Sequence, residues 1–128
     1  NSVVYLGHKL KHAQTLCGVP RILNFRVVPA DHAFQLYFYI YAVDNHSKFA
    51  RLVTHVPYTA WNVTPGEAID LPPLDFHTAC FRIPRHHHIA LGVNMKNHLY
   101  TPAIDRHRAS VTIDYKADDP PTLLVPLV

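Results

Sequence analysis

The sequence predicts an all-β fold, namely an antiparallel β-sandwich or flattened barrel of seven to eight strands with at most one short helix. Short runs that alternate apolar and polar residues recur along the chain, and turn-forming residues separate them roughly every 8–15 residues. The composition, with 11 prolines and 4 glycines, favours short strands joined by stiff connections. With 128 residues, of which 48% are hydrophobic, the chain is long enough for one domain over residues 1–128 with its own core.

The most regular alternation lies between Ala33 and Val43, in the segment AFQLYFYIYAV. Every second residue from Phe34 to Ala42 is apolar, whereas the other face carries Gln35 and three tyrosines. A period of two with one apolar face is typical of a strand that borders a core. We therefore expect this strand to be central and the other strands to pack on its apolar face.

The segments around it are predicted as follows. His8–Leu16 is the one segment with a helical alternative, because Gly18-Val19-Pro20 would end a helix there. Turn formers at 44–47 predict a hairpin between residues 33–43 and 48–56. The other predicted strands are Val3–Leu6, Arg21–Val28, Thr78–Ile83, Ile89–Asn94, Ala109–Tyr115 and Thr122–Val128, the last confined to a sheet edge by Pro126.

A long segment from Pro57 to Pro73 interrupts the strand pattern, since four prolines and a glycine punctuate it. It contains the only tryptophan, Trp61. A tryptophan in such a loop either covers one end of the core or serves as an exposed anchor for a ligand. Loops of this length are uncommon without a function.

The two cysteines and two glycosylation sequons indicate a cellular location. Cys17 and Cys80 can form a disulfide, although two buried thiols are the alternative. Asn45 and Asn62 head N-x-S/T sequons and are candidate glycosylation sites, the second weakened by Pro65. Together they predict a secreted, extracellular or virion-surface protein.

The tyrosines Tyr37, Tyr39 and Tyr41 form a ladder on one sheet face and, with Trp61, are the candidate binding residues. Tyrosine joins a large apolar ring to a polar tip and loses little entropy on contact, which favours it at interfaces. This face could contact a partner protein or stack on sugar rings. Alternatively, the 57–73 segment covers it.

Arginines and histidines gather in two predicted loops. The candidate polyanion-binding residues are Arg82, Arg85, Arg106 and Arg108, with an ordinary solvated end as the alternative. Among the 11 histidines, which make the net charge pH-dependent, His86 and His88 are weak candidate metal ligands. Neighbouring side chains on a strand point apart and no zinc-type cysteine spacing exists, so no metal or cofactor is predicted.

No catalytic motif is present in the sequence. None of the three serines, Ser2, Ser47 and Ser110, lies in a nucleophile elbow, and no glycine-rich phosphate loop occurs. No apolar run is long enough to span a membrane. The sequence therefore predicts a non-enzymatic interaction module that binds a protein partner or itself, as a homo-oligomer, through its aromatic face.

Two other functions are alternatives to this prediction. The aromatic face also suits a carbohydrate-binding, lectin-like domain. The arginine and histidine loops suit nucleic-acid or polyanion binding, but the net charge of +3 is too small to indicate it alone. Nucleic acid is therefore the least favoured partner.

Overall fold

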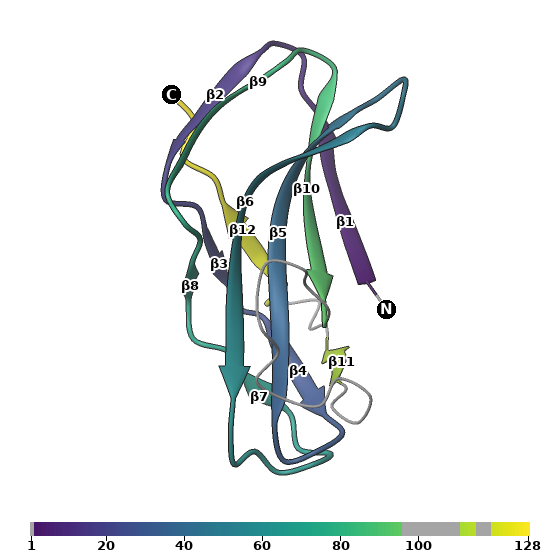
Figure 1. The fold of residues 1–128 in the computed structure, drawn as a ribbon, viewed down its shortest axis with the longest axis vertical. Coiled ribbons are helices and arrows are strands. Elements are labelled where there is room, and N and C mark those ends of the chain that lie inside the picture. The colour runs from purple at the N-terminus through teal and green to yellow at the C-terminus, as the bar shows by residue number, and fades with distance from the viewer. Residues whose placement is uncertain (1, 96–110, 115–118) are drawn as a thin grey trace.

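The computed structural model describes residues 2–95, 111–114 and 119–128, and all regular structure within them is β (Figure 1). Antiparallel sheets pack on one another, so the predicted all-β sandwich is confirmed. These residues contain no helix long and apolar enough to cross a membrane. They form twelve strands in place of seven or eight, because the strands of one layer are broken into short pieces.

One layer is a four-stranded sheet whose central position is taken by the predicted strand. In the order β1, β10, β5, β6 the strands are Ser2–Lys9, His87–Asn94, Phe34–Asp44 and Ala50–Ala60. The hairpin β5–β6 extends further than predicted, and Pro57 pairs with Tyr37. Proline is tolerated there because β6 is the edge of this sheet, where a missing N–H removes no ladder hydrogen bond.

The second layer consists of three small sheets along one path of the chain (Figure 1). Gly18, with φ 135°, and Asn24, with φ 58°, break that path into three strands. The first is β2 (Gln14–Gly18), which pairs with β9 (Ala79–Ile83). The second, β3 (Arg21–Leu23), lies between β12 (Thr122–Leu124) and β8 (Leu74–Asp75), and the third, β4 (Arg26–Pro29), lies between β11 (Val111–Asp114) and β7 (Ile69–Asp70). The helical alternative for residues 8–16 is wrong, since β1 and β2 occupy most of them.

The core lies between the layers and is built on the apolar face of β5. Every second residue from Phe34 to Ala42 is buried there, as the alternation predicted. Phe38 meets Phe25 of the second layer edge to face, with ring centroids 5.1 Å apart and planes at 90°. This geometry is favourable for aromatic pairs, so the two rings join the layers at the centre of the core.

A β-bulge in β6 changes which side chains face the core. Ile40 pairs with Thr54 but Tyr41 pairs with Leu52, which leaves Val53 without a partner in the register. Because sheet faces alternate with a period of two, one extra residue reverses the faces beyond it. Arg51 therefore lies opposite the core residue Ala42, in the position that simple alternation would give to Leu52.

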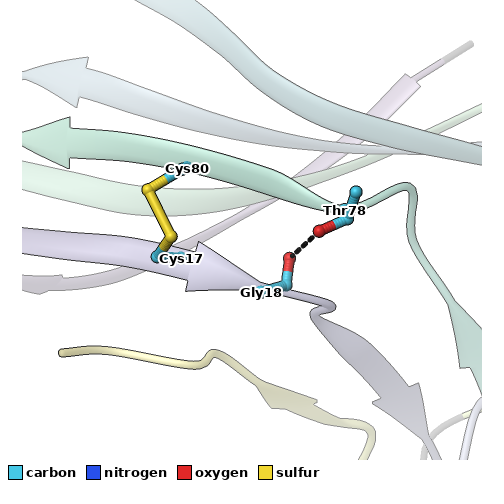
Figure 2. Close-up of a disulfide and its surroundings, with 4 residues drawn as sticks. All are labelled: Cys17, Gly18, Thr78 and Cys80. Atoms are coloured by element: carbon cyan, nitrogen blue, oxygen red, sulfur yellow. Dashed lines mark hydrogen bonds between the residues drawn. A yellow bond between two sulfur atoms is a disulfide. The ribbon is translucent and has the colours of Figure 1, made fainter.

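Cys17 and Cys80 are bonded and lie directly opposite each other on β2 and β9 (Figure 2). The next connection along this ribbon is a hydrogen bond of 3.2 Å that the Thr78 hydroxyl donates to the Gly18 carbonyl. Cys80 shares its strand face with Arg82, while Phe81 packs against the core. The bridge therefore lies on the outer side of the second layer.

Candidate functional site

The tyrosine ladder is mostly buried. Tyr37 is 0% exposed and Tyr39 is 9% exposed, while Tyr41 is only partly exposed. The rings of Tyr39 and Tyr41 stack with centroids 5.8 Å apart, and the edge of Tyr41 lies over Gly92, 3.0 Å from where a Cβ would be. Among the three phenols only Tyr41 reaches the surface, so they do not form the open contact face that the sequence suggested.

Trp61 lies apart from the core. Its side chain is 59% exposed at the end of β6, so it neither plugs the sandwich nor buries the tyrosines. The segment that follows it is held by Val63, whose N–H donates to the His32 carbonyl over 2.9 Å. The sequence left open whether Trp61 covers one end of the core or is exposed, and the structure agrees with the exposed side chain.

The histidines of the β9–β10 connection do not converge. His86 is exposed in a left-handed turn with φ 68°, and desolvation and the neighbouring Arg85 charge lower its pKa. His88 lies on β10, where its Nδ1 is 2.7 Å from the Gly7 carbonyl oxygen and its Nε2 is 3.1 Å from Asn45 Oδ1. Across residues 2–95, 111–114 and 119–128, no three His, Cys, Asp or Glu side chains gather in a way that could hold a metal ion.

The polyanion candidates are only partly placed. Arg85 is exposed in the turn, and Arg82 is exposed on β9. Arg106 and Arg108 lie outside the described residues. The structure therefore places only one of the two predicted basic loops.

The two sequons lie in different settings. The side chain of Asn45 is tied to His88 at the tip of the β5–β6 hairpin. Asn62 is exposed and left-handed, with φ 56°, directly after Trp61. Glycosylation and the secreted location stay predictions.

A pocket lies between the β5–β6 hairpin and the segment that joins β9 to β10. We call it the mouth pocket, and its volume is about 480 Å³. Charged and aromatic side chains of both layers line it, which the separate sequence motifs did not reveal. Its lining residues are Ala42, Asp44, Ser47, Phe49 and Arg51 from the hairpin, Phe81 and Arg82 from β9, Pro84 from the turn, and His87 from the start of β10.

The carboxylate in the mouth pocket is held by its own hairpin. Asp44 accepts hydrogen bonds from the His46 N–H over 3.1 Å and from the Ser47 hydroxyl over 2.9 Å. These bonds, with the nearby His87, lower the pKa of Asp44 and keep it ionised. The Ser47 oxygen also accepts from the Phe49 N–H over 3.2 Å. Ser47 is therefore a turn-stabilising residue here and has no imidazole partner within the described residues.

A second concavity follows the edge strand β1. It is a mainly apolar groove of about 730 Å³ between β1, β10 and residues 120–123. Both faces of β1 are exposed there, since Leu6 on one face is 58% exposed and Tyr5 on the other is 41% exposed. The sequence signal was the run VVYL, which is apolar at consecutive positions and so does not alternate. Such exposed apolar surface is typical of a contact with another protein part.

His55 is expected to make stability pH-dependent. Partial burial and the neighbouring His77, with ring centroids 5.2 Å apart, lower the pKa of His55 below its usual 6.5. As the pH falls below 6.5, His55 becomes protonated in the unfolded chain but stays neutral in the folded chain. The free energy of unfolding should therefore decrease until the pH passes the folded-state pKa of His55.

Melting temperatures of the wild type and His55→Gln between pH 8 and pH 5 would test this expectation. His55→Gln should flatten part of the acid slope, whereas His12→Gln, at an exposed position, should keep it. Equal slopes in all three proteins would count against the role of His55.

Comparisons with known proteins relate the fold to hydrolases. No family model matches the sequence, and no curated protein is similar to it. An α-amino acid ester hydrolase matches 99% of this chain with a TM-score of 0.79 and 9% identity. An aminopeptidase from a marine sediment Thaumarchaeota archaeon matches 99% with a TM-score of 0.74 and 11% identity, and a CocE/NonD family hydrolase from Staphylococcus aureus matches 100% with a TM-score of 0.66 and 9% identity.

These matches correct the predicted function. The chain spans only 25%, 26% and 33% of the length of those three proteins. At such low identities the likeness is one of fold, and the fold is that of a part of larger hydrolases. The expectation of a non-enzymatic, self-associating interaction module is contradicted by this finding, as are its carbohydrate-binding and nucleic-acid-binding alternatives.

Proposed function

We propose that the chain forms the β-sandwich part of a hydrolase that cleaves ester or amide bonds of amino acid derivatives. The observation that carries the proposal is the match of 99–100% of this chain to parts of an amino acid ester hydrolase, an aminopeptidase and a third hydrolase. A fold alone does not determine chemistry, but the three matches agree on the class of reaction.

Within this proposal the chemistry belongs to another part of the enzyme. In the portion of the chain that the structure describes, the Ser47 hydroxyl donates a hydrogen bond to the Asp44 carboxylate and has no histidine partner. Nucleophilic hydrolysis by serine requires a general base within hydrogen-bond reach. The sandwich would instead support and position the catalytic part.

The edge strand β1 is the proposed contact with that catalytic part. Val4 and Leu6 are more than half exposed, and the groove beside them is lined mainly by apolar atoms. Burying such side chains against another domain stabilises the contact by about 1.5–3 kcal/mol for each full side chain. The opposite edge of the same sheet, β6, carries Leu52, which is 40% exposed and provides a matched position.

The test is an assay of the native polypeptide that carries this sequence, with 4-nitrophenyl esters and 4-nitroanilides of amino acids as substrates. We expect hydrolysis of at least one of these classes, and a lower melting temperature and lower activity for Leu6→Asp. The substitution Leu52→Asp introduces the same charge at the other edge and should change neither property.

Two results would contradict the proposal in different ways. Absence of hydrolysis for every ester and anilide would reject the hydrolase assignment. Equal losses for Leu6→Asp and Leu52→Asp would reject β1 as the contact while leaving the reaction class in place.

A further inference from the structure

Arg51 lines the mouth pocket because of a shift in strand register, and its side chain is exposed to solvent there. The bulge at Val53 places Arg51 opposite Ala42, on the core side of the sheet, at the end where the two layers separate. Bulges often re-aim a side chain next to a functional site. Without the extra residue, Leu52 would occupy this position and continue the apolar core.

The two guanidinium groups in the pocket have no acidic partner within the described residues. Arg21 and Arg26, in contrast, are paired with Asp75 and with Asp114, at 2.7 and 3.1 Å. Arg51 approaches from β6 and Arg82 from β9, so the two layers each contribute one cation to the same space. Guanidinium groups bind planar oxyanions through two parallel N–H bonds, which makes a carboxylate a matching ligand.

The net charge of the pocket favours a singly charged ligand. Asp44 is the one acidic side chain that lines it, and its oxygens already accept bonds from Ser47 and the His46 N–H. The two arginines and the one aspartate together carry a single positive charge. A monoanion balances this charge, whereas a dianion would meet uncompensated repulsion from Asp44.

Two aromatic rings provide the apolar part of the site. Phe81 packs against the core and lines the same pocket as the buried Ala42, and Phe49 is 64% exposed on the hairpin. A ligand ring against Phe49 would remove apolar surface from water. The volume of about 480 Å³ falls within the size range of small-molecule sites.

From these observations we infer that the mouth pocket binds a carboxylate carried on a flat apolar group, with Arg51 and Arg82 as its charged ligands and Phe49 as its apolar contact. The inference goes beyond the proposed hydrolase function and does not depend on it, because the site is built from this chain alone.

The test is a calorimetric titration of the native polypeptide that carries this sequence with N-acetyl-L-phenylalanine. Its neutral amide lacks the charge, and acetate lacks the ring, so both should bind about tenfold more weakly or not measurably. Arg51→Gln and Arg82→Gln should each weaken binding of N-acetyl-L-phenylalanine by about five- to tenfold. Arg85→Gln removes the same charge from the neighbouring turn, outside the pocket lining, and should leave the affinity unchanged.

Phe49→Ala separates the apolar contribution from the charged one. It should weaken N-acetyl-L-phenylalanine binding, so that the affinity for this ligand falls toward that for acetate. The inference is overturned if the neutral amide binds as tightly as the acid, if Arg85→Gln weakens binding as much as Arg51→Gln, or if N-acetyl-L-phenylalanine does not bind to the folded wild type.

Discussion

Replacing Phe38 by alanine is expected to lower the free energy of unfolding by about 3–5 kcal/mol. The ring is fully buried on β5 and meets Phe25 across the two layers at 5.1 Å. The substitution removes buried apolar surface and leaves a cavity at the contact that joins the sheets, where the surrounding strands can relax only partly. Urea unfolding followed by circular dichroism would measure the change in midpoint and in free energy.

Phe49→Ala is the matched control for this prediction. It deletes the same ring at a position that is 64% exposed, and surface changes of this kind usually stay within about 0.5 kcal/mol. A loss for Phe38→Ala no larger than that for Phe49→Ala would show that the β5 face does not form the core described above.

Removing the bond between Cys17 and Cys80 is expected to cost about 4 kcal/mol, since it closes a loop with a sequence separation of 63 residues. In the chain-entropy model the bond acts by restricting the unfolded chain, so a longer loop gives a larger effect. The double variant Cys17→Ala with Cys80→Ala would be compared with the oxidised wild type by urea unfolding.

Reduction of the wild type provides the control for this comparison. The fully reduced wild type should unfold near the midpoint of the double variant, and the double variant itself should not respond to reductant. A wild type that keeps its midpoint after thiol titration has confirmed complete reduction would contradict the expected contribution.

The central hairpin was predictable because its signal is local. Over β5 the apolar residues alternate for nine positions, and one face of a strand is enough to fix its orientation toward a core. The strands β7 and β8 have only two residues each, too few for any periodicity. Their pairing with β4 and β3 depends on long-range register that no short segment encodes.

The mouth pocket was only half predictable. Arg82 was recognised as a cation in a basic segment, but Arg51 was not, because the alternation of Thr54, Val56 and Tyr58 extrapolates to Leu52 on the core side. The bulge at Val53 reverses this assignment without a glycine or proline to signal it. Bulges are properties of a strand pair, so a single strand's sequence does not determine them.

The tyrosine ladder shows a similar limit. The alternation correctly placed Tyr37, Tyr39 and Tyr41 on the face opposite the core, but a sequence pattern does not tell whether that face is covered. The relation to hydrolases was also beyond the sequence, since sandwich folds serve many functions and the chain carries no catalytic motif.

The position of the disulfide also determines how the molecule would respond to mechanical tension. A pull on both chain ends of the oxidised protein bypasses the residues between Cys17 and Cys80, because the force runs through the covalent bond. The hairpin β5–β6 and the strands β3, β4, β7 and β8 all lie inside that segment. Tension would extend the edge strand β1 and the last strands of the chain. The segment between the cysteines, whose sequence separation of 63 corresponds to roughly 210 Å of extended polypeptide, would not be extended while the disulfide is intact.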